Sequence, residues 1–300
     1  MSALYIAVVG DIHDLWNTND HLALQQLGVD LVLFVGDLGN ESLPVVRSIA
    51  ALDLPKAVVL GNHDAWYTAS SWGRKKAPYD HGQEDRVQTQ LTLLAESHVG
   101  YGKLDFLSWQ FSVVGSRPFS WGGPDWKNKT FLRERYGVTN FRESILKMVD
   151  NIQKTQTDTL IFLGHNGPWG LGDQPESICG RDWQPLGGDH GDPDFSEALL
   201  QARQLRKRIP LVAFGHMHHR LRHRQDCLRT RVVEDSHGTV YLNAACVPRI
   251  RPWPPATGSS CHHFSLIHWQ NQQVQAIESI WMDPQGHCVE RESIYARMSS

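Results

Sequence analysis

Five short apolar runs constrain the fold of this chain more than any other feature, because each stops at a glycine followed by polar side chains. They are LYIAVV (4–9), LVLFV (31–35), KAVVL (56–60), TLIFL (159–163) and LVAF (211–214), and the blocks after them read GDIHD, GDLGNE, GNHD, GHNGP and GHMHH. Continuous runs of Val, Ile, Leu and Phe are typical of strands covered on both faces. The sequence therefore predicts an α/β protein with buried strands.

Two helices are predicted between these runs. The first covers about 140–153, where Asn140 and Glu143 resemble a capping box. The second covers about 193–208, with Asp192 as its N-cap and proline at the first helical position. Their buried faces would be formed by Phe141, Ile145, Met148, Val149 and Ile152 in the first and by Phe195, Leu199, Ala202 and Leu205 in the second.

After His219 the pattern changes to short segments typical of antiparallel strands, among them TVYLNA, HHFSLIHW and QVQAIESIW. We expect residues 228–300 to form a C-terminal antiparallel sheet portion. A chain of 300 residues with 41% hydrophobic content can bury one sizeable core, so a single domain over residues 1–300 is expected.

Composition excludes several classes of protein. The formal charge of −3 provides no global basic field, which argues against binding to nucleic acid or to an anionic membrane. No apolar run approaches the roughly 18 residues of a membrane span. The five cysteines are scattered without a CxxC pair, and the chain enters a strand-like run at Leu4, so we expect a reducing, cytoplasmic location. The sequence leaves the oligomeric state open.

The polar blocks at the strand ends contain the side chains that bind metals. In an open α/β fold, ligands gather at the carboxyl ends of the strands. Carboxylates, imidazoles and an amide without thiolates suit divalent ions such as Mn, Fe, Zn or Ni. There are too many candidate ligands for one ion. They suit two ions that lie about 3.5–4 Å apart and share one carboxylate. The candidates in these blocks are Asp11, His13, Asp37, Asn62, His63, Asp64, His165, His216 and His218.

The ordered set D-x-H, G-D, G-N-H-D, G-H and G-H-x-H resembles the calcineurin-like metallophosphoesterase superfamily, and its GNHD and GHMH blocks are closer to the cyclic-nucleotide phosphodiesterase-like branch. The motifs span residues 11 to 218. The resemblance implies a four-layer αββα sandwich of two mixed sheets flanked by helices, with a dinuclear metal centre at the strand ends. The second block, GDLGNE, lacks the arginine that protein phosphatases carry after this aspartate, which argues against a Ser/Thr protein phosphatase.

The resemblance also implies roles for individual residues. The residues that would hold the first metal are Asp11, His13, Asp37 and His218. Asp37 would bridge to a second metal, which Asn62, His165 and His216 would complete. His63 is not a ligand in this pattern and would protonate the leaving-group oxygen, oriented by Asp64.

The implied activity is hydrolysis of phosphate esters by a hydroxide that bridges the two metals. A phosphodiesterase acting on a small nucleotide-like substrate is the leading interpretation. A phosphomonoesterase of broad specificity and a metal-binding scaffold without catalysis are the alternatives. A nuclease would show strongly salt-dependent DNA binding, which the acidic composition argues against.

Three further segments are candidates for contacts with substrate. The glycine-rich stretch 169–194 is expected to overhang the site, the loop 115–129 carries cations and tryptophans, and the segment 219–231 carries five arginines. Solvated or packed loops are the alternative in each case. The residues proposed as substrate-binding are Arg117, Trp121, Asp182 and Arg249. We interpret Cys179 and Cys246 as structural, and His219 as either a surface residue or a support of the site.

Overall fold

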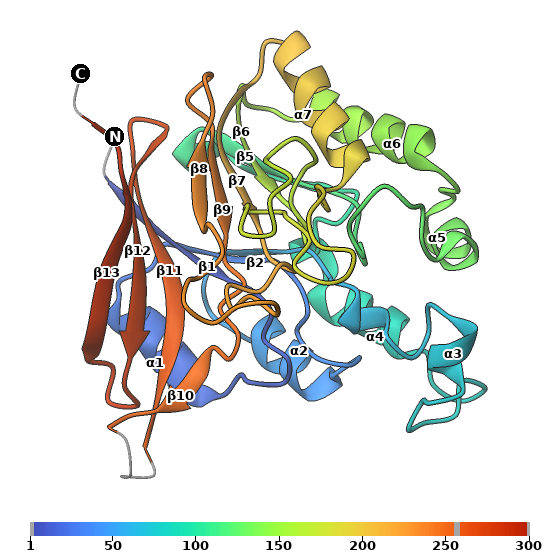
Figure 1. Ribbon diagram of the computed structural model, residues 1–300, viewed down its shortest axis with the longest axis horizontal. Helices are drawn as coiled ribbons and strands as arrows, with labels where there is room; N and C mark the ends of the chain where they lie inside the picture. The colour runs from blue at the N-terminus through green and yellow to red at the C-terminus, as the bar shows by residue number, and fades with distance from the viewer. Residues whose placement is uncertain (1–2, 255–258, 299–300) are drawn as a thin grey trace.

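The computed structural model describes residues 3–254 and 259–298, and its strands form two sheets that face each other (Figure 1). The first sheet has the strand order β13-β12-β11-β1-β2-β3, and β10 pairs with β11. Its strands are β1 (Leu4–Val9), β2 (Leu31–Phe34), β3 (Lys56–Val58), β10 (Ile250–Pro252), β11 (Ser260–Gln270), β12 (Gln273–Met282) and β13 (Cys288–Ala296).

The second sheet has the order β4-β5-β6-β7-β9-β8. Its strands are β4 (Lys103–Phe106), β5 (Phe111–Gly115), β6 (Thr159–Leu163), β7 (Arg208–Phe214), β8 (Val232–Glu234) and β9 (Val240–Asn243). Both sheets are mixed. In the first sheet the parallel strands β1, β2 and β3 form one side and the antiparallel strands β11, β12 and β13 the other, whereas in the second sheet the antiparallel strands β4 and β8 lie at the two margins of a parallel centre.

Helices cover the outer face of each sheet. The helices α1 (Thr18–Gln26), α2 (Leu43–Ala50), α4 (Arg86–Leu94) and α5 (Lys129–Tyr136) pack in a core with the first sheet, and α6 (Phe141–Gln153) and α7 (Pro193–Gln204) pack in a core with the second. The short elements are α3 (Ser71–Arg74) and the 3-10 turns η1 (His63–Ala65), η2 (Ala95–Ser97) and η3 (Leu107–Trp109). A third core lies between the two sheets. The predicted four-layer αββα sandwich is therefore confirmed.

Alternation along β1 explains why its sequence is apolar throughout. Ile6 and Val8 point into the core between the sheets, whereas Ala7 and Val9 point into the core beneath the helices. Successive side chains of a strand point to opposite faces, so a strand covered on both sides needs apolar residues at every position.

The parallel strands bring the polar blocks to one place. β1, β2 and β3 run parallel in the first sheet, and β5, β6, β7 and β9 run parallel in the second. Their carboxyl ends therefore meet at a common edge of the sandwich, and the five blocks identified in the sequence begin there. In residues 3–254 and 259–298, no helix combines the length and the apolar character that crossing a membrane requires.

Two expectations about secondary structure need correction. The strands after residue 228 do not form a sheet of their own, because β8 and β9 extend the second sheet while β10 to β13 extend the first. The strand β9 even pairs parallel to β7. The second predicted helix ends at Gln204 rather than 208, and Leu205 is 41% exposed instead of buried. The first helix begins as predicted, with the Asn140 side chain accepting a hydrogen bond from the Glu143 amide.

Arg117 and Arg249 lie in the interior, and this burial argues against the substrate contacts that were expected of them. Arg117 is 2% exposed and binds Asp192 at 2.7 Å and Asp194 at 2.8 Å, both at the start of α7. Arg249 is 1% exposed and binds Asp20 of α1 at 2.7 Å. Asp192 holds the N-cap position of α7, but its carboxylate accepts from Arg117 rather than capping the helix.

Replacing Arg117 with leucine is expected to lower the free energy of unfolding by about 3–5 kcal/mol, because two buried carboxylates would lose their cation. Chemical denaturation measures the change. Arg142→Leu on the exposed face of α6 is the control and should change the value by less than about 0.5 kcal/mol. An equal effect of the two substitutions would contradict the structural role of Arg117.

Candidate metal centre

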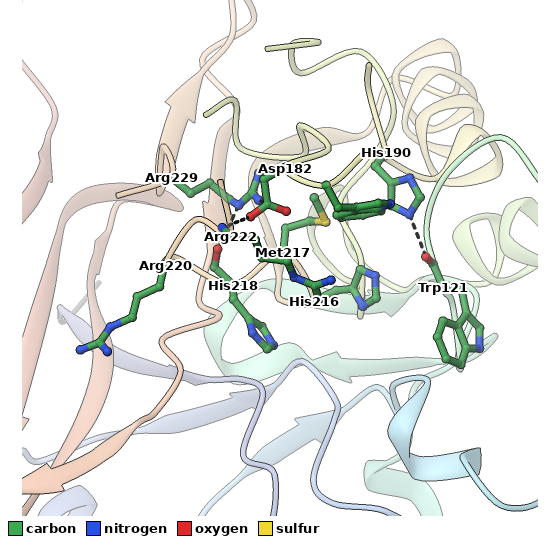
Figure 2. Close-up of a pocket in the computed structure, with 10 residues that line it drawn as sticks. Trp121, Asp182, His190, His216, Met217, His218, Arg220, Arg222 and Arg229 are labelled. Carbon is green, nitrogen blue, oxygen red and sulfur yellow. Dashed lines mark hydrogen bonds and ion pairs between the residues drawn. The ribbon is translucent and has the colours of Figure 1, made fainter. Parts of the chain in front are cut away.

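The side chains of seven predicted metal ligands, here called metal-type side chains, converge where the parallel strands of the two sheets end. The first sheet contributes the loops after β1, β2 and β3, and the second contributes the loops after β6 and β7. Their residues are Asp11, His13, Asp37, Asn62, His165, His216 and His218. Figure 2 shows the site from nearby: His216 and His218 lie on the same short segment, and both imidazoles point away from Arg229.

One group of ligand atoms joins the loops after β1 and β7. Nε2 of His218 lies 3.5 Å from Oδ1 of Asp11, and 3.4 Å from Nε2 of His13. The three side chains place one ligand atom each within 4.8 Å of one another. This spacing is suitable for a shared cation.

A second group surrounds the opposite side of Asp37. Nε2 of His165 lies 3.3 Å from Oδ1 of Asp37 and 3.1 Å from Nδ1 of His216. Oδ1 of Asn62 lies 2.9 Å from the same nitrogen of His165. The other carboxylate oxygen of Asp37, Oδ2, lies 3.9 Å from Nε2 of His13 in the first group. Asp37 therefore stands between the two groups, as a bridging carboxylate would.

The backbone at these positions adopts conformations that most side chains avoid. Asp11 has φ of 49°, Asp37 of 53° and His216 of 66°, all in the left-handed region. Such strain persists only where the surrounding structure enforces it, and it is concentrated at functional sites. Gly61 is required by close approach, since a Cβ atom there would lie 2.3 Å from Oδ1 of Asp37.

The donor set fits divalent metal ions. Nδ1 of His165 lies 2.8 Å from the carbonyl oxygen of Val35, so it donates its proton there and presents the lone pair of Nε2 to the site. In two places, imidazole nitrogens face each other: His13 with His218, and His165 with His216. A cation between two such nitrogens would be coordinated by both rings. Imidazole and carboxylate ligands without thiolate suit borderline divalent ions.

At Asp11 and His216, the surroundings also favour the protonation states that bind metals. Burial alone would raise the pKa of Asp11, but the hydrogen bond and charge of His218 outweigh it and hold that pKa well below its usual range. Burial, reinforced by His165, holds the pKa of His216 well below the ordinary histidine value. A carboxylate and a neutral imidazole are the forms that coordinate a metal.

His63 lies beside the two groups, and its position differs in one respect from the expectation. Its Nε2 is 3.9 Å from Oδ2 of Asp37, and its ring stacks on Trp66 with centroids 4.5 Å apart. Asp64 does not orient it. The buried Asp64 carboxylate instead accepts hydrogen bonds from the backbone amides of Leu38 at 2.9 Å and Gly61 at 2.7 Å, and so joins the loops after β2 and β3.

The side chain that forms a hydrogen bond with the His63 ring is Asn40, which was not among the residues predicted from the sequence. Its Oδ1 lies 2.6 Å from Nδ1 of His63. An amide oxygen accepts, so Nδ1 donates, and Nε2 is the nitrogen that faces the site. Asn40 belongs to the GDLGNE block, so the sequence motif already contained it. Only the folded structure shows that this loop reaches His63.

A pocket of about 260 Å³ adjoins His216 and His218. It is lined by Trp121, Asp182, Trp183, His190, His216, Met217, His218, Arg220, Arg222 and Arg229 (Figure 2). Two of the predicted substrate-binding residues, Trp121 and Asp182, therefore lie beside the metal-type histidines, whereas Arg117 and Arg249 are not among the lining residues.

The segment 169–194 forms one wall of this pocket, as expected of a loop that overhangs the site. It is held in place by the buried Arg229, which donates to the carbonyl oxygens of Ser177, Gly180 and His218. His219 is also buried, with Nε2 2.9 Å from the carbonyl oxygen of Asn243, so it supports the site from inside.

Comparison with known proteins identifies the family to which this chain belongs. A family model described as calcineurin-like phosphoesterase matches residues 4–220, and no curated protein matches the chain. Among solved structures, similar chains include a dimetal phosphatase from Danio rerio (12% identity, 98% of this chain and 99% of that chain covered, TM-score 0.49). Another is a purple acid phosphatase from yellow lupin seeds (14% identity, 97% of this chain and 53% of that chain covered, TM-score 0.44). A third is an archaeal phosphodiesterase (11% identity, 93% of this chain and 100% of that chain covered, TM-score 0.38). The chain therefore belongs to the calcineurin-like phosphoesterase family and is a metal-dependent hydrolase of phosphoric esters.

Proposed function

We propose that this protein is a phosphodiesterase that acts on a small nucleotide-like substrate. The observation that carries the proposal is the position of Asp37 between two groups of ligand atoms, one formed with His13 and the other with His165 and His216. The pocket beside His216 and His218 supports a small substrate, because its volume is about 260 Å³. Flat rings in its lining, Trp121 and Trp183, suit a nucleoside.

Two divalent ions are the cofactors in this proposal, with Mn, Fe, Zn or Ni compatible with the donors. The first would be held by Asp11, His13 and His218, the second by Asn62, His165 and His216, and Asp37 would be shared. Bound ions supply positive charge to the phosphoryl oxygens and lower the pKa of water. The strained loops hold the ligand side chains in place before substrate arrives, so binding needs little rearrangement.

His63 is the proton donor to the leaving-group oxygen in this proposal. Its Nε2 faces the site near Asp37, while Asn40 holds Nδ1 and Trp66 packs against the ring face. Two contacts from different directions fix the imidazole plane, so the proton on Nε2 is delivered along one direction. Asn40 is a positioning residue, because it acts through His63.

We place the protein in a reducing compartment such as the cytoplasm. All five cysteines lie in the described part of the chain, and none forms a disulfide. Burial raises the pKa of Cys179 well above its ordinary value, which supports a structural role for this thiol.

Replacing Asp37 with asparagine is expected to remove most bound metal, because the shared carboxylate would lose its charge. Metal per chain is measured by plasma mass spectrometry after loading with manganese and desalting. Asp14→Asn is the matched control, since Asp14 is an exposed acid of the same edge and belongs to none of the ligand groups. Retention of wild-type metal content by Asp37→Asn would contradict the bridging role.

His63→Ala is expected to keep its metal and to lose about 10²–10⁴-fold in kcat for a dinucleoside monophosphate, whose alkoxide leaving group needs a proton. The loss should be much smaller for bis(p-nitrophenyl) phosphate, because nitrophenolate departs without one. Asn40→Ala should show the same pattern to a smaller degree. Equal losses on both esters, or loss of metal, would count against proton donation by His63.

The function itself is tested by turnover of two nitrophenyl esters with manganese, iron, zinc or nickel added. We expect the metal-loaded protein to have a higher kcat/KM for bis(p-nitrophenyl) phosphate than for p-nitrophenyl phosphate. The reverse preference would indicate a phosphomonoesterase. Absence of turnover with every metal would indicate a binding scaffold.

A further inference from the structure

The pocket beside the metal-type histidines has two walls that come from segments far apart in the sequence. Asp182, Trp183 and His190 belong to the segment 169–194, and the second wall belongs to the arginine-rich segment 219–231, which contacts the first through Asp182 and Trp183. His216 and His218 lie at the inner end of the pocket (Figure 2). A molecule bound at the candidate metal centre would therefore extend between these walls.

Both walls are built rigidly. Besides its bonds to four backbone carbonyls, Arg229 forms an ion pair with Asp182 at 3.3 Å. The Asp182 carboxylate also accepts a hydrogen bond from the backbone amide of Arg222 at 2.8 Å. Asp182 and Arg229 are both buried, and each compensates the charge of the other. The pocket walls are therefore part of the rigid fold, and the negative charge of Asp182 is already compensated by Arg229.

The arginines of the segment 219–231 fall into two classes. Arg224, Arg229 and Arg231 each pair with a carboxylate. In the described part of the chain, Arg220 and Arg222 have no carboxylate partner, and these are the two that line the pocket together with Arg229. Arg222 lies against the ring of Trp183, with its guanidinium carbon 5.4 Å from the ring centroid. Figure 2 shows Arg220 at the outer side, extending away from the histidines.

This arrangement leaves uncompensated positive charge a short distance from the metal-type histidines. A guanidinium that lies over the face of a tryptophan still has the N–H donors of its own plane free, and these bind phosphate oxygens in a forked geometry. The phosphate undergoing hydrolysis would already be bound at the metal centre. A cation farther along the pocket therefore has a different anionic group to bind.

We propose that the substrate carries a second anionic group, and that Arg222 binds it while the attached nucleoside packs against the tryptophans that line the pocket. Arg220 adds positive charge at the outer end. This inference rests on the proposed phosphodiesterase function and specifies its substrate class, which is a nucleotide with a further phosphate beyond the scissile diester.

The test uses two substrates that differ only in the second phosphate. The 5′-(p-nitrophenyl phosphate) of thymidine and its 3′-phosphorylated form share the scissile diester and the nitrophenolate leaving group. For the wild type, kcat/KM should be at least about tenfold higher for the 3′-phosphorylated ester, the usual effect of one charge-assisted hydrogen-bonded contact. A ratio near one would overturn the proposal.

The variant Arg222→Gln should reduce this ratio to within about threefold of one, because the charged fork is lost. Arg222 is exposed, and a ratio taken within one variant does not depend on the fraction of folded protein. Arg224→Gln is the matched control and should keep the wild-type ratio, since Arg224 is exposed on the same segment but pairs with Glu176 and Asp226. Equal losses on both esters in Arg222→Gln would show that Arg222 contacts the scissile phosphate, and would overturn the proposal.

Failure of the underlying function can be separated from failure of this inference. If neither ester is hydrolysed with any metal, calorimetry in EDTA compares thymidine 3′,5′-bisphosphate with thymidine 5′-monophosphate. Tighter binding of the bisphosphate that disappears in Arg222→Gln would retain the anion site although the phosphodiesterase function had failed. Equal binding of the two nucleotides would overturn the site as well.

Discussion

The carboxylate of Asp37 is the point on which the rest of the site depends. One of its oxygens faces His165 at 3.3 Å and accepts the amide of His63 at 2.8 Å, and the other faces His13 at 3.9 Å. These three histidines come from the ends of β1, β3 and β6, so a single acid links both sheets. The three buried cores between the four layers hold those strand ends rigidly, which explains why the strands are apolar on both faces.

Buried acids outside the site keep the loops in register. Asp64 joins the loops after β2 and β3 through backbone amides, and Asp192 and Asp194 join α7 to Arg117 at the end of β5. Isolated buried charges are costly, but these are paired or accept several hydrogen bonds. Polar groups that resemble site residues in the sequence thus serve mainly to position the loops that carry the ligands.

Much of this could be predicted from the sequence. Apolar runs ending in glycine located the strands, and the D-x-H and G-H-x-H spacings located the ligand candidates, because strand direction and side-chain alternation are local properties. The errors concern contacts between distant segments. Arg117 and Arg249 looked available because nothing near them in the sequence reveals Asp192, Asp194 or Asp20. The role given to Asp64 belongs to Asn40, since the approach of one loop to another has no local pattern. The C-terminal strands were expected in one sheet but are divided between two. Their pairing partners are determined by tertiary packing, which has no local pattern either.

In our proposal, the metal ligands at the strand ends carry out the reaction and the segments 169–194 and 219–231 select the substrate. We propose that Asp37 is shared between two metal ions. It is tested most directly by anomalous X-ray diffraction from crystals of the manganese-loaded protein. We expect two anomalous peaks that flank the Asp37 carboxylate, one next to Asp11, His13 and His218 and the other next to Asn62, His165 and His216. A single peak, or peaks that do not contact Asp37, would contradict it.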